Sequence, residues 1–286
     1  MPNGIVIIDK PQGWTSMDVC AKLRGILHEK RVGHAGTLDP MATGVLPVFV
    51  GQATKAVSFA EGGQKVYEAV LQLGLVTDTQ DTTGETLEER AVTVTEDEVR
   101  AALPRFLGEI EQIPPMYSAV KVNGQKLYDL ARKGREVERP ARDIIVHEME
   151  LLDFDENAQK GTLRCVVSKG TYVRTLVNDL GEKLGTLAVL HSLVRTRSGA
   201  YPLDRCRSFE DCERAMADGT MQQLLLPTDS LFTDCPAVAL TAEGAERIAR
   251  GAVVFPRQTD SLPETAGTLC RVYHEGRFLM LGQVRE

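Results

Sequence analysis

The sequence has 286 residues, which predicts about two domains, although one large domain is compatible with that length. Hydrophobic residues make up 43% and charged residues 26%, a composition that excludes a disordered or fibrous chain. With 33 Lys and Arg against 40 Asp and Glu, the net charge of −7 excludes a uniformly basic nucleic-acid coat but leaves room for a local basic groove.

The N-terminal part of the chain alternates short apolar runs with polar loops. Residues 5–8 predict a buried strand, and Ser16 can cap the helix that follows. Residues 31–44 are rich in glycine and lack periodicity, which indicates a loop. A second apolar strand is expected at 45–50, and the alternation over 65–73 is typical of a half-buried strand.

The middle of the chain opens with an acidic stretch at 76–98 and continues with longer elements. A threonine followed three residues later by a glutamate predicts a capping box at the start of a helix. The elements expected from there on are a helix over 95–107, a hairpin of 144–154 and 162–168, and a helix that begins between residues 171 and 175.

The clearest change in composition falls at residues 226–236. Beyond it, 242–250 predicts a helix, and 269–273 and 278–284 predict strands. We therefore expect a large domain over 1–228 and a small β-rich domain over 229–286.

Targeting and redox signals favour a cytoplasmic protein. The six cysteines include no C-x-x-C pair, so a zinc ribbon or a thioredoxin-like motif is not supported and reduced, free thiols are expected. The opening residues, MPNGIVIIDKPQGW, lack the basic start of a signal peptide. No run of about 18 uncharged apolar residues occurs, so no membrane span is expected.

Local charge differs from the global sum. Residues 121–142 carry a net charge of +4 and residues 160–200 a net charge of +5. Two positive segments suit a groove that follows the phosphates of a nucleic acid, because each neutralised phosphate releases counterions. A solvated charged face explains the same charges equally well, so a polyanionic partner needs a second line of evidence.

That second line is the loop at residues 33–44, GHAGTLDPMATG. It lacks the Gly-Lys-Ser/Thr ending of a phosphate-binding loop, and it is not a serine nucleophile elbow. It offers one carboxylate, Asp39, whose backbone is held extended by Pro40, among glycines that permit close approach of a ligand. Judged alone, an aspartate before proline is more often a structural turn.

The residues GHAGTLDPMATGVLPV closely resemble the catalytic signature of the TruB family of bacterial tRNA pseudouridine-55 synthases. Further matches follow in the same order over residues 5 to about 200, so chance is a poor explanation. They are DKP at 9–11, KVY at 65–67 with LG at 73–74, TDTQD at 77–81 with GE at 84–85, SKGTYVRT at 168–175, and LVR at 193–195, where Val194 departs from the arginine often found.

The resemblance implies an α+β fold with a mixed, mainly antiparallel sheet, flanking helices and a small C-terminal PUA-like domain. It also implies that the T-loop uridine at tRNA position 55 is isomerised to pseudouridine without a cofactor or a metal. Asp39 would attack either the sugar or the base while the glycosidic bond breaks. The freed uracil would then rotate and rejoin through C5.

The same resemblance assigns roles to single residues. Asp39, Tyr67 and Arg174 would be catalytic, with Arg174 as the cation that keeps the Asp39 carboxylate ionised and oriented. Tyr67 would stack on the flipped base and is the candidate for the proton transfer at C5. The implied substrate-binding residues are Lys10, His34, Lys126, Lys133, Arg135, Tyr172 and Leu193.

Each of these residues also has a structural interpretation. Tyr67 and Leu193 in apolar strands are typical core residues, and Lys10 can simply close a strand. His34 has no other histidine at a metal-ligand spacing, so no metal site is expected. Only their ordered occurrence with Asp39 favours the site.

The partner implied by the resemblance is the T-arm of tRNA. Residues 116–142 resemble the RNA-covering insertion of the family, called the thumb, which favours an enzyme that needs no obligatory protein partner. The C-terminal domain would grip the acceptor side of tRNA, although it carries net negative charge. Two alternatives remain open: an RNA chaperone that remodels the T-arm, and a guide-RNA ribonucleoprotein subunit that requires partner proteins.

Overall fold

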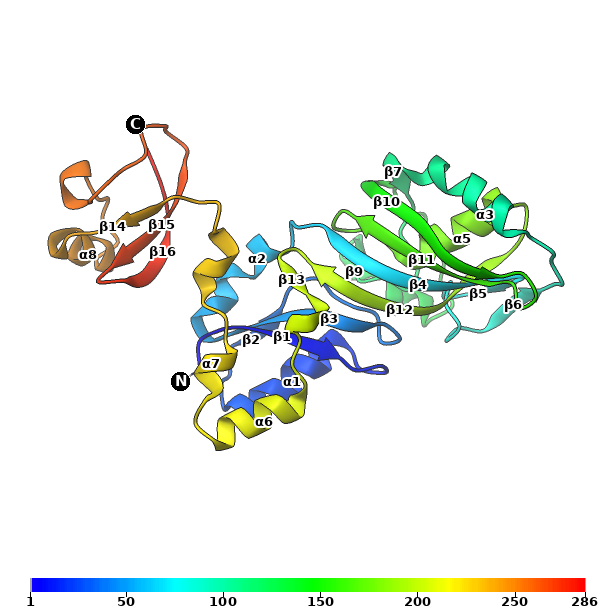
Figure 1. The fold of residues 1–286 in the computed structure, drawn as a ribbon, viewed down its shortest axis with the longest axis horizontal. Helices are drawn as coiled ribbons and strands as arrows, with labels where there is room; N and C mark the ends of the chain where they lie inside the picture. The colour runs from blue at the N-terminus through cyan, green and yellow to red at the C-terminus, as the bar shows by residue number, and fades with distance from the viewer. Residues whose placement is uncertain (1, 286) are drawn as a thin grey trace. The chain divides into compact units, whose positions relative to one another are not determined.

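The computed structural model describes residues 2–285. The chain divides into two compact units, and the boundary in the sequence falls between Leu225 and Leu226. Figure 1 shows both units, and each is described by itself below. All six cysteines are free thiols. Within the described residues, no helix is both long and apolar enough to cross a membrane.

One large sheet forms the centre of the first unit. Its strand order is β1-β3-β12-β4-β11-β10-β7, with β2 paired to β3 and β13 paired to β12. The β3–β12 pair is parallel and the other pairs are antiparallel, which confirms the expected mixed, mainly antiparallel sheet. The strands are β1 (Gly4–Lys10), β2 (Val32–His34), β3 (Thr43–Val50), β4 (Lys65–Leu73), β7 (Gly108–Gln112), β10 (Arg142–Asp155), β11 (Lys160–Val167), β12 (Ala188–Ser198) and β13 (Tyr201–Pro202).

Helices and two small hairpins surround this sheet. The α-helices are α1 (Ser16–Leu27), α2 (Val57–Ala60), α3 (Glu96–Ala102), α4 (Leu127–Ala131), α5 (Val173–Lys183), α6 (Phe209–Ala217) and α7 (Met221–Leu224). The hairpins are β5 (Leu75–Thr77) with β6 (Thr86–Glu89), and β8 (Lys121–Val122) with β9 (Gln125–Lys126). Short 3₁₀ helices occupy Gly51–Ala56, Leu103–Phe106 and Leu203–Arg205.

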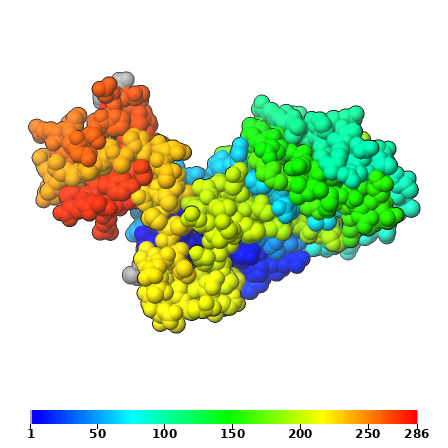
Figure 2. All heavy atoms as spheres, viewed as in Figure 1, coloured from blue at the N-terminus to red at the C-terminus, as the bar shows by residue number. Residues whose placement is uncertain are grey.

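Two separate apolar cores join helices to the sheet. Figure 1 shows α3 and α5 near one end of the sheet and α1 and α6 near the other. In the first, α3 and α5 pack on β4, β10, β11 and β12, with Leu176 and Leu180 fully buried. In the second, α1 and α6 pack at the β1–β3 end, where Leu23 is fully buried. Figure 2 shows the yellow surface of α6 and α7 directly against the blue N-terminal segment. Each such leucine contributes about 1.5–3 kcal/mol by burial, so both cores stabilise the packing of helices on the sheet.

The cap of the first helix is Thr15, so the expectation that Ser16 caps it is wrong. The Thr15 hydroxyl accepts a hydrogen bond from the Asp18 amide, and the Asp18 carboxylate accepts one from the Thr15 amide. This capping box satisfies two free amides at once. Ser16 becomes the first helical residue, which leaves its hydroxyl free for another partner.

The loop expected at 31–44 is shorter than predicted. Val32–His34 forms strand β2 on the edge of β3, and β3 itself begins at Thr43. The helix expected over 95–107 also ends early, at Ala102, and a 3₁₀ turn over Leu103–Phe106 follows. Pro104 explains this change because proline lacks the amide that a continuing α-helix requires. The hairpin of β10 and β11 and the helix that begins at Val173 are confirmed.

The second unit is a small sheet with one α-helix. Its strand order is β14-β15-β16, and Val238, Cys270 and Val284 form a buried cluster in it. The expected helix and the two expected strands are confirmed. The elements are β14 (Ala237–Ala239), α8 (Ala242–Ala249), β15 (Leu269–His274) and β16 (Arg277–Gln283), with 3₁₀ turns at Thr228–Phe232 and Pro256–Gln258.

Candidate active site

Asp39 lies in the loop between β2 and β3, and both of its chain neighbours are anchored. The Ser16 hydroxyl accepts a hydrogen bond from the Leu38 amide at 2.9 Å and donates to the Leu38 carbonyl at 3.2 Å. The Pro40 carbonyl accepts from the Gly13 amide at 2.8 Å. The Asp39 side chain keeps 34% of its surface exposed. The loop therefore presents a carboxylate to solvent on a backbone that is held on both sides.

Lys10 contacts the backbone of this loop at Pro40. Its side chain is fully buried, and its Nζ donates to the carbonyls of Pro11, Trp14 and Pro40 at 2.9, 2.6 and 3.2 Å. Burial lowers the pKa of Lys10 to about 8, partly offset by the nearby Asp39 carboxylate. The structure thus places this lysine against backbone carbonyls rather than at the surface, which supports a positioning role.

Arg174 is the cation that faces Asp39. It lies in the first turn of α5, is only 3% exposed, and brings its Nε to 2.9 Å from Asp39 Oδ2 as an ion pair. Its Nη1 donates to the Thr79 carbonyl at 2.7 Å, and its Nη2 donates to the Tyr117 carbonyl at 3.0 Å. A buried cation with these partners is fixed in orientation and holds one edge of its guanidinium against the Asp39 carboxylate.

A second carboxylate, Asp81, lies 3.8 Å from Nη1 of Arg174. Asp81 is buried and is itself held by the hydroxyls of Thr79 and Thr83 and by the Thr83 amide. The turn at residues 77–81, called the acidic turn below, therefore supplies Arg174 with the charge of Asp81 and the carbonyl of Thr79. A buried charge without partners has a high desolvation cost, and the contacts with this turn offset part of that cost for Arg174.

The expected aromatic residue, Tyr67, and the expected Leu193 are both buried in the large sheet. They come from the neighbouring strands β4 and β12, and both are 6% exposed. They belong to one apolar cluster with Leu38 and Met41, which flank Asp39 in the chain. Tyr67 and Leu193 therefore lie in the same apolar core as the two residues that flank Asp39.

Two more of the expected site residues stand at the ends of elements. His34 ends β2, and burial together with the charge of Arg195 lowers its pKa, which favours the neutral imidazole. Tyr172 precedes α5, and the Gln112 side chain clamps its backbone with hydrogen bonds of 2.8 and 3.1 Å. Burial raises the pKa of the Tyr172 hydroxyl.

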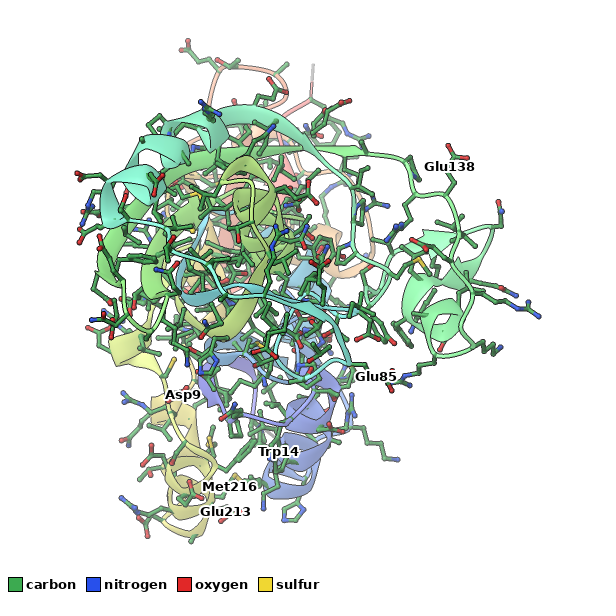
Figure 3. All side chains as sticks on the ribbon, turned by 90° about the vertical axis from the view of Figure 1, so that its right-hand side faces the viewer. Asp9, Trp14, Glu85, Glu138, Glu213 and Met216 are labelled. Carbon is green, nitrogen blue, oxygen red and sulfur yellow. The ribbon has the colours of Figure 1, made fainter. Side chains whose placement is uncertain are left out.

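The remaining expected residues lie on the thumb segment, residues 116–142. Lys126 donates to the Tyr128 hydroxyl at 2.8 Å and lies over its ring, and Lys133 and Arg135 are exposed. Figure 3 shows the part of this segment that carries Glu138 projecting from the sheet, on the same side as the turn with Glu85. These cations belong to the thumb segment, whereas Asp39 belongs to the loop between β2 and β3.

Arg195 is a member of the site that sequence reasoning did not single out. It is fully buried in β12, and its Nε and Nη2 donate to the carbonyls of Val45 and Gly36 at 2.7 and 2.8 Å. Gly36 precedes Asp39 in the chain and Val45 follows it, so Arg195 contacts the backbone before and after the catalytic carboxylate. The available signal was the period of two in a strand, which places residue 195 on the same inward face as Leu193.

Lys65 is a fourth buried cation near the loop, after Lys10, Arg174 and Arg195. Its Nζ donates to the carbonyls of Glu61 and Gly63, each at 3.1 Å, and burial followed by the charge of Arg195 lowers its pKa to about 8. Within residues 2–285, no group of three or more His, Cys, Asp or Glu side chains could hold a metal ion. The site is therefore a carboxylate held among cations and carbonyls.

Comparison with known proteins places this geometry in a family. Residues 24–173 match the model of the N-terminal domain of TruB family pseudouridylate synthases, and residues 174–233 match the tRNA pseudouridylate synthase B C-terminal domain. The tRNA pseudouridine synthase B of Bacillus cytotoxicus is 47% identical over 87% of this chain and 83% of its own length. That of Bacillus licheniformis is 45% identical over 97% of this chain and 88% of its own.

Solved structures show the same fold. A crystal structure of a Cbf5-Nop10-Gar1 complex matches with a TM-score of 0.73 at 27% identity, over 99% of this chain and 78% of that one. The archaeal box H/ACA sRNP Nop10-Cbf5 complex matches with a TM-score of 0.72 at 25% identity, over 99% and 79%. The resemblance seen in the sequence is thus confirmed, and the chain belongs to the TruB family of pseudouridylate synthases.

Proposed function

We propose that this member of the TruB family converts the T-loop uridine at tRNA position 55 to pseudouridine, with Asp39 as the catalytic carboxylate. The observation that carries the proposal is the ion pair of 2.9 Å between Asp39 and the buried Arg174. A partly exposed carboxylate held against a buried cation keeps one orientation toward a substrate. The names of the family and of its relatives point to tRNA as that substrate.

The chemistry is an isomerisation in which atoms balance within one nucleotide. The bond between the sugar C1′ and uracil N1 breaks, and a bond between C1′ and C5 forms. C5 loses a proton and N1 gains one. Asp39 acts as the nucleophile, either at C1′ or at the base, and stays bonded to that atom while the freed uracil rotates. Its bond to the substrate breaks once C5 is joined to C1′, which returns the free carboxylate.

Tyr67, Leu193 and His34 are the groups we assign to the extruded base and its surroundings. A target base must leave the stack before an enzyme can work on it, and an aromatic ring beside it offsets the lost stacking. Tyr67 stacks on the base and takes part in the proton transfer at C5, and Leu193 packs beside the ring. His34 fills the gap left in the RNA loop, where a neutral imidazole, favoured by its lowered pKa, stacks without an added charge.

Binding of the T-arm falls to cations of the thumb segment, of which Lys133 and Arg135 are exposed, and to Tyr172, which directly precedes α5. Lys126, Lys133 and Arg135 contact phosphates, which fixes the register of the RNA without reading its sequence. We assign residues 1–228 to the catalytic domain and 229–286 to a PUA-like RNA-binding domain. The enzyme works in the cytoplasm, where its tRNA substrate is made.

A test uses the purified chain alone on an unmodified tRNA transcript. We expect pseudouridine at position 55, and none in a matched transcript that carries cytidine there. A requirement for a guide RNA or for added proteins would contradict the proposal and would favour a ribonucleoprotein subunit. Product at another uridine would contradict the assigned position.

A second activity, remodelling of the T-arm, is supported by the exposed cations Lys133 and Arg135, which lie on another segment of the chain than the Asp39 loop. RNA binding through Lys133 and Arg135 does not need the carboxylate, so folding of tRNA can persist without chemistry. The Asp39→Asn protein should then retain its full effect on the refolding of a misfolded transcript. Loss of that effect together with catalysis would exclude an independent chaperone role.

A further inference from the structure

Tyr117 joins the thumb segment to the catalytic pair through two different atoms. Its backbone carbonyl accepts a hydrogen bond from Nη2 of Arg174 at 3.0 Å. Its side-chain hydroxyl donates to Oδ2 of Asp78 at 3.0 Å. Tyr117 is partly buried, at the point where the chain leaves the sheet and enters the thumb.

These contacts close a ring around the arginine. Arg174 donates to the carbonyls of Tyr117 and Thr79, and Tyr117 donates to Asp78, which precedes Thr79 in the chain. The other oxygen of Asp78 accepts from the Glu85 amide at 2.8 Å, so the acidic turn itself is held. A closed ring of this kind resists displacement of any one member more than isolated hydrogen bonds do.

The ring leaves the Nε edge of the guanidinium for Asp39. With Nη1 held by Thr79 and Nη2 held by Tyr117, the planar group cannot rotate without the loss of a buried hydrogen bond. The contact with Asp39 is an ion pair rather than a directed hydrogen bond, so the carboxylate depends on the arginine being held from elsewhere. Tyr117 supplies that hold from the thumb side.

The hydroxyl of Tyr117 remains a donor at neutral pH. Its hydrogen bond to Asp78, and then burial, raise the pKa of this tyrosine above its ordinary value. The hydroxyl therefore keeps the proton that it donates to Asp78.

We propose that Tyr117 is a positioning residue for the reaction, which sets the orientation of Arg174, and through it of Asp39, from the thumb segment. This inference rests on the proposed function. It assigns to the thumb an effect on the rate of the chemical step in addition to RNA binding. The hydrogen bond to Asp78 is what keeps the Tyr117 carbonyl in place.

The test is Tyr117→Phe, which removes the hydroxyl and leaves the ring and the carbonyl. With saturating tRNA, we expect kcat to fall about tenfold, the usual effect of one lost hydrogen bond to a charged group, while KM changes less than about twofold. The matched control is Tyr273→Phe in the second unit, where the hydroxyl likewise donates to an aspartate, Asp229, at 2.6 Å. That variant should keep the kcat of the wild type.

A second variant, Asp78→Ala, removes the same hydrogen bond from the other side. We expect its kcat to fall at least as far, and the Tyr117→Phe/Asp78→Ala double variant to be no slower than Asp78→Ala alone. An unchanged kcat in Tyr117→Phe, or a raised KM with an unchanged kcat, would overturn the inference and leave the proposed function intact. Absence of pseudouridine with the wild-type protein would overturn both.

Discussion

The guanidinium of Arg174 faces a carboxylate on one edge and backbone carbonyls on its other two nitrogens. Because each of its nitrogens has a partner, the guanidinium of Arg174 can be buried, at 3% exposure, without an unpaired charge. This arrangement also separates two tasks: holding the arginine, which the carbonyls do, and orienting Asp39, which the charge does.

Substitution of Arg174 by lysine should therefore abolish most activity although it keeps the charge. A lysine ammonium is a point charge and cannot hold Asp39 and the two carbonyls together as the planar fork does. We expect kcat to fall by about a hundredfold or more, and the Kd for tRNA to change by less than about threefold. Single-turnover assays and filter binding measure the two effects, and a variant with near-normal turnover would refute this division of tasks.

Lys10 should give the stability of the protein a specific pH dependence. Its pKa is about 8 in the folded protein and 10.5 ordinarily, so between these values the unfolded chain binds more protons. The contribution of Lys10 to the free energy of unfolding should thus be flat below pH 8 and rise above it, by at most about 1.4 kcal/mol per pH unit.

Urea titrations of the wild type and of Lys10→Met at pH 7, 8, 9 and 10 test this expectation. Methionine carries no proton, so the difference between the two proteins isolates the lysine. The advantage of the wild type should grow between pH 8 and 10. A constant difference would show that burial does not lower this pKa.

Single residues differ in how far the sequence could place them. The pairing of Asp39 with Arg174 was predicted, because both stand in motifs of the family. The role of Arg195 was not, since its partner carbonyl on Gly36 lies 159 residues away in the chain. Motif spacing cannot identify which backbone oxygen a buried cation reaches, because every residue carries one.

At the scale of elements, the Asp39 loop ends where β3 begins to pair in parallel with β12, a strand pair called the seam below. Gly44 pairs with Arg195 there and has a φ of 94°, a conformation that favours glycine. A Cβ on Gly44 would overlap the backbone oxygen of Arg195. The strand that carries an arginine of the site therefore packs directly on the end of the catalytic loop.

Gly44→Ala should destabilise the protein by about 3 kcal/mol or more, because the alanine meets both an unfavourable φ and a backbone clash. Gly134→Ala is the matched control, since Gly134 also has a positive φ, of 65°, but has no atom within 4 Å of an added Cβ. We expect the control to lose about 1 kcal/mol. Equal losses in chemical denaturation would show that the seam is not tightly packed.

Elements with a strong apolar pattern were predicted well, and short polar ones were not. The strands at 65–73 and 144–154 alternate clearly, and both are present as β4 and β10. The hairpin of β5 and β6 was missed because β6, Thr86–Glu89, is exposed throughout and buries no side chain that could mark it.

At the scale of the whole molecule, the net charge of −7 is an average over unlike segments. The basic residues gather in the thumb segment and in the region that ends with Arg195 and Arg197, beside the Asp39 loop. A protein arranged in this way binds one folded RNA at one place and repels others elsewhere. The charges of these segments can be read from the sequence. That Arg195 lies beside the Asp39 loop cannot, because it depends on the pairing of β12 with β3, two strands far apart in the chain.

Neutralisation of the thumb should weaken binding rather than chemistry. A variant with glutamine at Lys126, Lys133 and Arg135 should lower the slope of log Kd against log salt by about 2, as expected for a few lost phosphate contacts. Its rate at saturating tRNA should stay within about threefold of the wild type. The matched control carries glutamine at Lys22, Arg90 and Arg100, three other surface cations that pair with acids. An equal change in the control would refute a thumb-specific contact.

The central claim is that the Asp39 carboxylate carries the reaction, and Asp39→Asn tests it most directly. The asparagine keeps the size of the side chain and the loop contacts of Leu38 and Pro40, so fold and tRNA binding should match the wild type. The measurement is pseudouridine at position 55 of an unmodified transcript, with the variant in excess over RNA. The account predicts no detectable product, and substantial pseudouridine formed by the folded, tRNA-bound variant would contradict it.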